Sequence, residues 1–207
     1  LDGIDVMMTD IGNDNGALST KAIQSVAPFI TELKAALPGT SIITATVTAK
    51  YMHWDYASLL HATWINVHAF ETGGNVGPGA KPGQQSPLWF LNDASAIWVN
   101  KGYPKSKLVL GIPAFGLRYN ELDANGNNAS WGSYDYIAYK DIIATSKDPN
   151  IHTKEYDASI SKGVYFNGIP LVTQKAEFIR NNGFKGAYIW AGDYDTMDAK
   201  SLIKTIY

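Results

Sequence analysis

Hydrophobic positions along the chain form short apolar runs that alternate with stretches of helical periodicity. Apolar and β-branched runs bounded by turn residues predict five strands, at 1–10, 41–47, 64–70, 107–113 and 186–191. Apolar residues recur at helical spacing between them, over 19–37, 54–62, 89–100, 171–182 and 199–207. Strands that alternate with helices indicate an α/β fold built on a parallel sheet.

Two longer segments interrupt this alternation. Residues 71–87 form a Gly- and Pro-rich loop, and loops of this length inside a compact domain are more often functional than accidental. Residues 114–167 are rich in Tyr, Asn and Gly, and they contain one predicted helix, 136–145, among short strands and turns. In the first predicted helix, Ser19 is a candidate N-cap and Pro28 predicts a kink or a break.

The first apolar run, LDGIDVMMTD, carries charges inside a predicted buried strand. The apolar residues that can be buried on it are Leu1, Ile4, Val6 and Met8. Gly3 allows a neighbouring backbone to approach closely. A carboxylate on a buried strand costs several kcal/mol unless it is paired or functional, so Asp2 and Asp5 need an explanation.

Composition excludes several classes of function. A hydrophobic fraction of 45% in 207 residues suits one globular domain with a substantial core. A net charge of −2 without a basic cluster argues against nucleic-acid and membrane-surface partners, and no apolar run approaches the roughly 18 residues of a membrane span. The chain has no cysteine, and its histidines show no metal-ligand spacing, so we expect no metal and no cofactor. These histidines are His53, His61, His68 and His152.

The first run resembles the signature strand of family 18 glycoside hydrolases, the chitinases, whose pattern is D-G-x-D-x-D-x-E. Asp2, Gly3 and Asp5 match this pattern, whereas its third Asp falls on Met7 and its catalytic Glu on Thr9. Further passages resemble the family in the family's own order; they are WINVHAFE, GQQSPL, KGYPKSKLVLGIPAFG and GFKGAYIWAGDYD. Because they occur in order, these matches are far more specific than the first strand alone.

The resemblance implies a (β/α)8 TIM barrel of which this chain supplies the fourth to eighth strands. It divides the chain into a barrel portion at 1–113, a small α+β insertion after the seventh strand at 114–167, and a second barrel portion at 168–207. A barrel that lacks three strands cannot close, so we expect another chain or fragment to supply strands one to three. The chain begins inside a strand without a signal peptide, which indicates a truncation or a processed piece, and the resemblance implies a secreted or extracellular protein.

The family's chemistry, as the resemblance implies it, is a substrate-assisted hydrolysis. The acetamido oxygen of the substrate attacks the anomeric carbon, a protonated Glu acts on the leaving oxygen, and an Asp two residues earlier orients the acetamido group. Met7 and Thr9 stand at these two positions, and neither side chain can do that work near neutral pH. We therefore expect hydrolysis near background, with Asp2 and Asp5 keeping a structural hydrogen-bond network.

The resemblance also places candidate ligand-binding residues beyond the first strand. Glu71 matches the acidic residue that follows the family's sixth strand, His68 and Phe70 replace a Met and a Tyr there, and Arg118 lies next to the position of a family Arg. Trp190 corresponds to the eighth-strand Trp, which either stacks on a sugar ring or packs in the core. The other tryptophans weighed are predicted to pack inside; they are Trp54, Trp89, Trp98 and Trp131.

Three functions follow from these observations. The first is a catalytically inactive chitinase-like domain that binds chitin-type or other N-acetylglucosamine-containing glycans or has a structural role. The second is an active chitinase or endo-N-acetylglucosaminidase whose displaced acid is Asp10 or Glu71. The third is a protein-interaction scaffold that uses the open sheet edge and the loop at 71–87.

Overall fold

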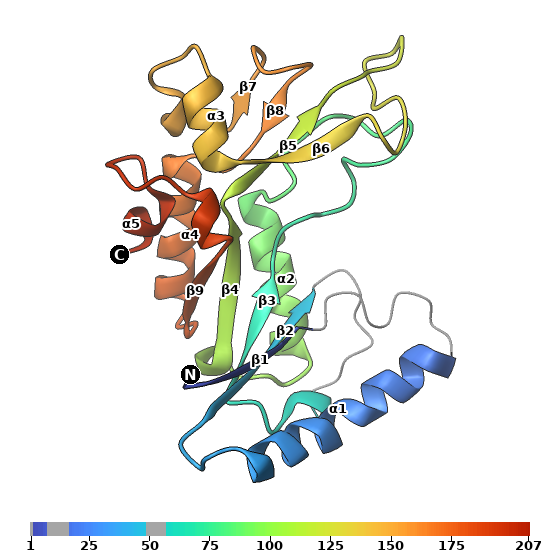
Figure 1. Cartoon of the computed structure of the whole chain (residues 1–207), viewed down its shortest axis with the longest axis vertical. Coiled ribbons are helices and arrows are strands. Elements are labelled where there is room, and N and C mark those ends of the chain that lie inside the picture. The colour runs from blue at the N-terminus through green and yellow to red at the C-terminus, as the bar shows by residue number, and fades with distance from the viewer. Residues whose placement is uncertain (1, 8–16, 49–56) are drawn as a thin grey trace. The chain divides into compact units, whose positions relative to one another are not determined.

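A computed structural model of the chain describes residues 2–7, 17–48 and 57–207 (Figure 1). It divides into two compact units. The first unit comprises Leu1–Ala69, Asn92–Gly111 and Ile179–Tyr188, and the second comprises Phe70–Leu91, Ile112–Phe178 and Ile189–Tyr207. The domain boundaries expected from the sequence stay a prediction.

A parallel sheet forms the centre of the first unit. Its strands are β1 (Gly3–Met7), β2 (Ile42–Thr48), β3 (Trp64–His68), β4 (Leu108–Pro113) and β9 (Gly186–Trp190), in the order β1-β2-β3-β4-β9. Strand β1 pairs with β2, β2 with β3 and β3 with β4, all in parallel. All five predicted strands are confirmed, and their order in the sheet follows the chain, as it does in a (β/α) barrel.

Four helices lie close to their predicted ranges. They are α1 (Ala17–Ala36), α2 (Leu88–Asn100), α4 (Ile169–Asn181) and α5 (Leu202–Ile206). Helix α1 begins two residues before Ser19, so the prediction of Ser19 as its N-cap was wrong, and it continues as one helix through Pro28. From residue 57 on, the helix predicted at 54–62 is only the 3-10 turn η1 (Ala57–Leu59), because the amides of Leu60 and Ala62 bond three residues back.

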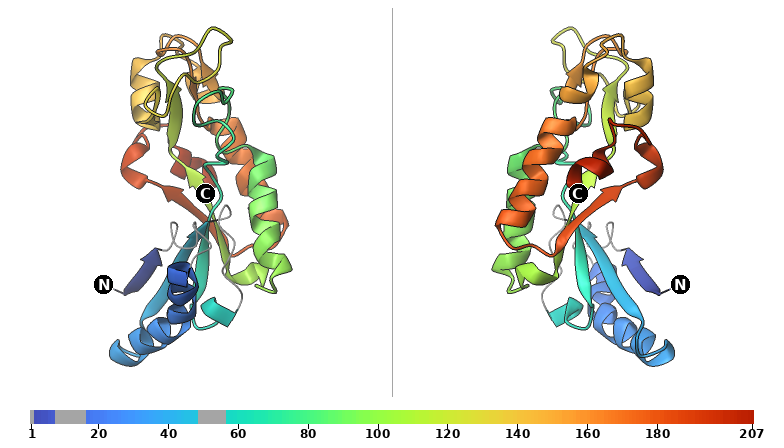
Figure 2. Two further views of the ribbon diagram at one scale, coloured as in Figure 1. Left: turned by 90° about the vertical axis from the view of Figure 1, so that its right-hand side faces the viewer. Right: turned by 90° about the vertical axis from the view of Figure 1, so that its left-hand side faces the viewer.

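The two faces of the parallel sheet differ sharply in polarity. The residues of one face have no solvent exposure; they are Ile43, Ala45, Val47, Ile65, Val67, Leu108 and Leu110. Helix α1, drawn in blue in Figures 1 and 2, contacts β2 and contributes the buried Val26 and Ile30. The alternate positions carry polar groups and a tryptophan; they are Thr44, Thr46, Thr48, Trp64, Asn66 and His68. The hydrophobic core of this unit therefore lies on one face of the sheet, and its polar side chains lie on the other.

Strand β1 lies at the edge of this sheet and is less buried than its sequence suggests. Ile4 is 41% exposed and Met7 is 46% exposed, and Asp5 between them is exposed as well, so the expectation of a buried strand was wrong for Ile4 and Asp5. The reason is its position, because β2 is the only strand that pairs with it among the described residues. The close approach expected at Gly3 is confirmed, since a Cβ atom placed there would lie 1.8 Å from the carbonyl oxygen of Ile42.

An antiparallel sheet forms much of the second unit. Its strands are β5 (Phe115–Tyr119), β6 (Tyr134–Ala138), β7 (Tyr156–Asp157) and β8 (Val164–Tyr165), in the order β6-β5-β8-β7. Helix α3 spans Tyr139–Thr145, and short 3-10 turns occur at η2 (Lys105–Lys107), η3 (Ile151–Thr153) and η4 (Gly192–Tyr194). The helix predicted at 136–145 was wrong in its first three residues. Tyr136 pairs with Leu117 of β5, and this sheet contact overrides the local helical pattern.

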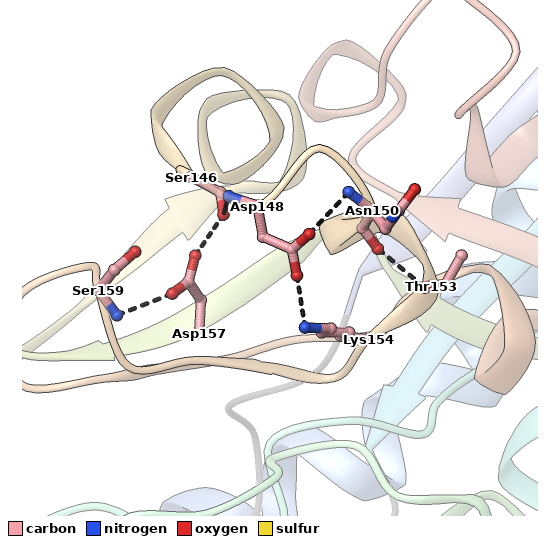
Figure 3. A network of polar contacts seen from close by, with 7 residues as sticks. All are labelled: Ser146, Asp148, Asn150, Thr153, Lys154, Asp157 and Ser159. Carbon is pink, nitrogen blue, oxygen red and sulfur yellow. Dashed lines mark hydrogen bonds and ion pairs between the residues drawn. The ribbon is translucent and has the colours of Figure 1, made fainter.

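A polar network closes the turn between α3 and β7 (Figure 3). Asp157 accepts hydrogen bonds from the Ser146 hydroxyl at 2.5 Å and from the Ser159 amide at 2.7 Å, and Asp148 pairs with Lys154. Burial raises the pKa of Asp157, but the bonds from Ser146 and Ser159 outweigh it and leave this pKa lowered. Asp148, Lys154, Asp157 and Ser159 are among the residues that line a hollow of about 430 Å³. Their carboxylates are used within the turn, so we assign the network a structural role.

Candidate functional site

The carboxylate of Asp5 is the centre of a hydrogen-bond network on the polar face of the first unit. It accepts bonds from the hydroxyls of Thr44, at 2.5 Å, and Thr46, at 2.8 Å. It also accepts a bond from Nδ2 of Asn66 at 3.0 Å, and Oδ1 of Asn66 in turn accepts one from Nε1 of Trp64 at 3.1 Å. Three strands thus converge on this charge, and the expected structural network is present for Asp5. Both Asp5 and Asp2 are exposed to solvent.

Met7 occupies the next position on the same face of β1. Residues two apart on a strand point the same way, and the register places Asp5 beside Thr44 and Met7 beside Thr46. A half-exposed thioether therefore follows the Asp5 network where the signature pattern has a carboxylate. Thr9 and Asp10 lie outside the described residues.

Removing the Asp5 carboxylate is expected to destabilise the fold by about 1–2 kcal/mol, because the buried hydroxyls of Thr44 and Thr46 lose their acceptor. Urea unfolding of Asp5→Ala measures this cost. Asp2→Ala is the matched control, since it removes a carboxylate from an exposed position of the same segment. Equal costs for the two substitutions would contradict the role given to Asp5.

His68 follows further along the polar face and is buried. Its Nδ1 lies 3.4 Å from the hydroxyl of Tyr188, on β9. Across the described ranges, no group of three or more His, Cys, Asp or Glu residues is placed to hold a metal ion. His68 is therefore a buried polar residue of the sheet, and its role toward a ligand stays a prediction.

In the second unit, Glu71 is held by the loop that it begins. Its backbone adopts φ 61°, a left-handed conformation that is costly for a residue with a side chain. Its amide donates to Oε1 of Gln85 at 2.9 Å. Burial, and then the charge of the Glu71 carboxylate, which also accepts a hydrogen bond from the Tyr136 hydroxyl, raise the pKa of Tyr136. The loop therefore presents the Glu71 carboxylate to the hydroxyl of Tyr136.

Phe70 is linked to Tyr136 through a row of packed aromatic rings. It is 2% exposed and packs edge-on against Phe115, with ring centroids 5.6 Å apart, and Phe115 packs edge-on against Tyr136 at 5.3 Å. Tyr136 is 48% exposed, so its ring is the accessible end of this aromatic row. The family resemblance implied that Phe70 contacts a ligand. In the structure Phe70 is buried, and Tyr136 is the aromatic side chain of this row that a ligand can reach.

Arg118 is engaged in an ion pair across β5 and β6. Its Nε and Nη2 donate to the two carboxylate oxygens of Asp135, at 2.8 and 2.6 Å. The hydrogen bonds from Arg118 lower the pKa of Asp135. Because both side chains are partly exposed, the pair contributes at most about 1 kcal/mol. The guanidinium binds a ligand only if it leaves or shares this partner.

The tryptophans divide between core and surface. Trp98 is fully buried, as predicted, but Trp89 is 60% exposed and Trp131 is 69% exposed, so the packing prediction was wrong for these two; Trp54 lies outside the described residues. Trp190 ends β9 and is 41% exposed, which favours the stacking alternative for its ring.

Two polar residues of the second unit were missed by sequence reasoning. Gln85 binds the amides of Glu71 and Thr72, and Tyr136 faces the Glu71 carboxylate. The alternation of YDYIA was the available signal for Tyr136, since period-two polarity indicates a strand. No comparable signal marks Gln85.

Comparison with known proteins places the chain in a well-populated group. A family model described as glycosyl hydrolases family 18 matches residues 1–195. Chitinase 1 of Aphanocladium album is 27% identical over 165 residues, which cover 74% of this chain and 37% of that protein. The chain therefore spans little more than a third of the length of this curated relative.

Solved structures share the fold along the whole chain. A chitinase from Bacteroides thetaiotaomicron has a TM-score of 0.78 at 22% identity, covering 100% of this chain and 62% of that one. YKL-39, solved in the presence of chitooligosaccharides, has a TM-score of 0.74 at 21% identity, covering 100% of this chain and 68% of that one. The predicted fold class, part of an α/β barrel with a small α+β module, is confirmed. In the described segments, no helix has the length and apolarity needed to cross a bilayer.

Proposed function

Because the chain belongs to glycosyl hydrolases family 18, we propose that it is a chitinase-like domain that binds N-acetylglucosamine-containing glycans without hydrolysing them. The main observation that supports this proposal is the position of Met7. Its side chain shares the face of Asp5 on β1, at the signature position of the carboxylate that orients the substrate's acetamido group. With Thr9 at the position of the general acid, the two groups that the reaction requires are both replaced. General acid catalysis alone is worth about 10²–10⁴ in rate.

Glycan binding is supported by polar and aromatic side chains of the second unit. Glu71 and Tyr136 offer a carboxylate and a hydroxyl for sugar hydroxyls, and the half-exposed rings of Tyr136 and Trp190 suit the apolar face of a pyranose. YKL-39, a structural neighbour, was solved with chitooligosaccharides, and we carry this class of ligand to the present chain by proposal. An extracellular location is proposed on the same family grounds.

We also propose that further barrel strands cover β1 and the polar face beside it. The supporting observation is the exposure of Ile4 and Met7 on the edge strand. Strands one to three of the family's barrel, in the same protein or in a second chain, are the occupants that fit this edge.

Incubation with chitotetraose tests the proposed function. We expect saturable binding by calorimetry, weakened at least fivefold in Trp190→Ala, with no product by mass spectrometry above a protein-free control. Product release that disappears in Glu71→Gln or Asp10→Asn would show instead an active glycosidase with a displaced acid. If neither binding nor product is detected, the result favours the protein-interaction scaffold.

A further inference from the structure

A lysine is buried inside the second unit, and among the described residues no carboxylate forms an ion pair with it. Lys175 lies on α4 and has no solvent exposure. Its Nζ lies 2.7 Å from the carbonyl oxygen of Ser86, 2.7 Å from the hydroxyl of Ser86 and 2.5 Å from Oδ1 of Asn167. Burial lowers the pKa of Lys175 to about 7, although the charge of Glu155 acts in the opposite direction. A group so costly to bury needs a function that an apolar residue could not perform.

The residues around Lys175 form the base of the loop at 71–87. Gln85 joins the two ends of this loop, because its Oε1 accepts from the amide of Glu71 at 2.9 Å and its carbonyl oxygen accepts from the amide of Thr72 at 3.0 Å. Ser86, the next residue, is the one that Lys175 holds twice. The lysine therefore anchors the point at which the loop closes.

A second set of bonds runs from Lys175 to the same base. Asn167, which accepts from Nζ, donates its Nδ2 to Oε1 of Gln84 at 3.2 Å. Gln84 donates its own Nε2 to the carbonyl oxygen of Phe166 at 2.6 Å. Two routes thus connect one ammonium group to the last residues of the loop.

The three contacts suit both protonation states of Lys175. A charged ammonium donates to all three oxygens. A neutral amine donates to the Ser86 carbonyl and to Oδ1 of Asn167, and it accepts from the Ser86 hydroxyl, the only one of the three groups that can reverse its role. The anchor is therefore kept across neutral pH.

We propose that Lys175 is a positioning residue, whose Nζ fixes the base of the 71–87 loop and so the left-handed backbone of Glu71. The consequence for ligand binding rests on the proposed function, in which Glu71 contacts the glycan. Without the lysine, the bonds of Gln85 to Glu71 and Thr72 no longer rest on an anchored Ser86. The loop then opens at its base while the antiparallel sheet stays folded.

Amide hydrogen exchange of Lys175→Met tests this directly. We expect the amides of Glu71 and Thr72 to exchange at least tenfold faster than in the wild type, while those of β5 and β6 keep their protection. We also expect chitotetraose affinity to fall at least fivefold. Arg180→Met is the matched control, because it removes an exposed cation from the same helix, and it should change neither quantity.

Unchanged protection at Glu71 and Thr72 in folded Lys175→Met would overturn the proposal. If the wild type fails to bind chitotetraose, the proposed function falls, but the exchange result still decides the role of Lys175. Should Lys175→Met fail to fold, Ser86→Ala removes one contact and keeps the carbonyl acceptor. It should accelerate exchange at the same two amides by about twofold to fivefold, and no acceleration there would equally overturn the proposal.

Discussion

Raising the pH from about 7 to about 10 is expected to increase the free energy of unfolding by about 1.4 kcal/mol per pH unit at most. The cause is Lys175, whose pKa burial lowers from 10.5 to about 7. Between these two values the unfolded chain holds a proton that the folded chain lacks, and stability rises with pH wherever the unfolded state binds more protons. Below pH 7 both states are protonated, so the destabilisation is then fully present and constant.

Three tyrosines with raised pKa values end this rise of stability on the alkaline side. Burial raises the pKa of Tyr119 to about 12, and it also raises the pKa values of Tyr136 and Tyr139. Tyrosines of the unfolded chain ionise near pH 10, so these groups contribute stability that is present below pH 10 and lost above it. We therefore expect maximum stability near pH 10, unusually far to the alkaline side.

Urea unfolding from pH 6.5 to 11 measures this profile. In Lys175→Met the rise between pH 7 and 10 should disappear, and the fall above pH 10 should remain. Arg180→Met should keep both features, because its guanidinium is exposed. A wild-type profile that is flat or falls between pH 7 and 9.5 would contradict a neutral amine at Lys175.

Gly3→Ala is expected to destabilise the protein by about 3 kcal/mol, the upper part of the usual range for overpacking. The new Cβ would lie 1.8 Å from the carbonyl oxygen and 2.9 Å from the amide nitrogen of Ile42, and backbone atoms of a paired strand cannot move aside as a side chain can. The pairing of β1 with β2 should weaken, and the amide of Ile42, which donates to the Asp2 carbonyl oxygen at 2.9 Å, should exchange faster.

Gly39→Ala is the control for this substitution. No atom lies within 4 Å of a Cβ placed at Gly39, so its unfolding free energy should change by less than about 0.5 kcal/mol. If the two variants were equally stable, the steric role given to Gly3 would be wrong.

The sheet and the Asp5 network were accessible from sequence because each has a local signal. The β-branched run at 41–47 and the apolar run at 107–113 are bounded by turn residues, and both are strands in the structure. A carboxylate inside the apolar run after Gly3 called for partners, and the buried hydroxyls of Thr44 and Thr46 on the neighbouring strand supply them. Short-range pattern was sufficient in these cases.

Other features depend on contacts between distant segments. The pairing with β5 places Tyr136 in a strand against the helical pattern of the residues that follow it. Trp131 is exposed although most tryptophans are largely buried. Lys175 had one overlooked signal: it stands at helical spacing between the buried Val172 and Ile179, where an apolar residue is expected. Its partner Ser86 is 89 residues away in sequence. The helical spacing could therefore identify Lys175 as unusual, but it could not identify the residue that Lys175 contacts.

Asp5 on β1 and Asp2, immediately before this strand, have a consequence for self-association. Among the described residues this strand pairs on one side only, and an edge of that kind is a template on which a second copy can add a strand. Two copies joined there would bring their own carboxylates close together, and like charges on adjoining strands repel. The acidic residues thus discourage fibre-like stacking of this protein, and a strand that offered cations or neutral polar groups would meet no such repulsion.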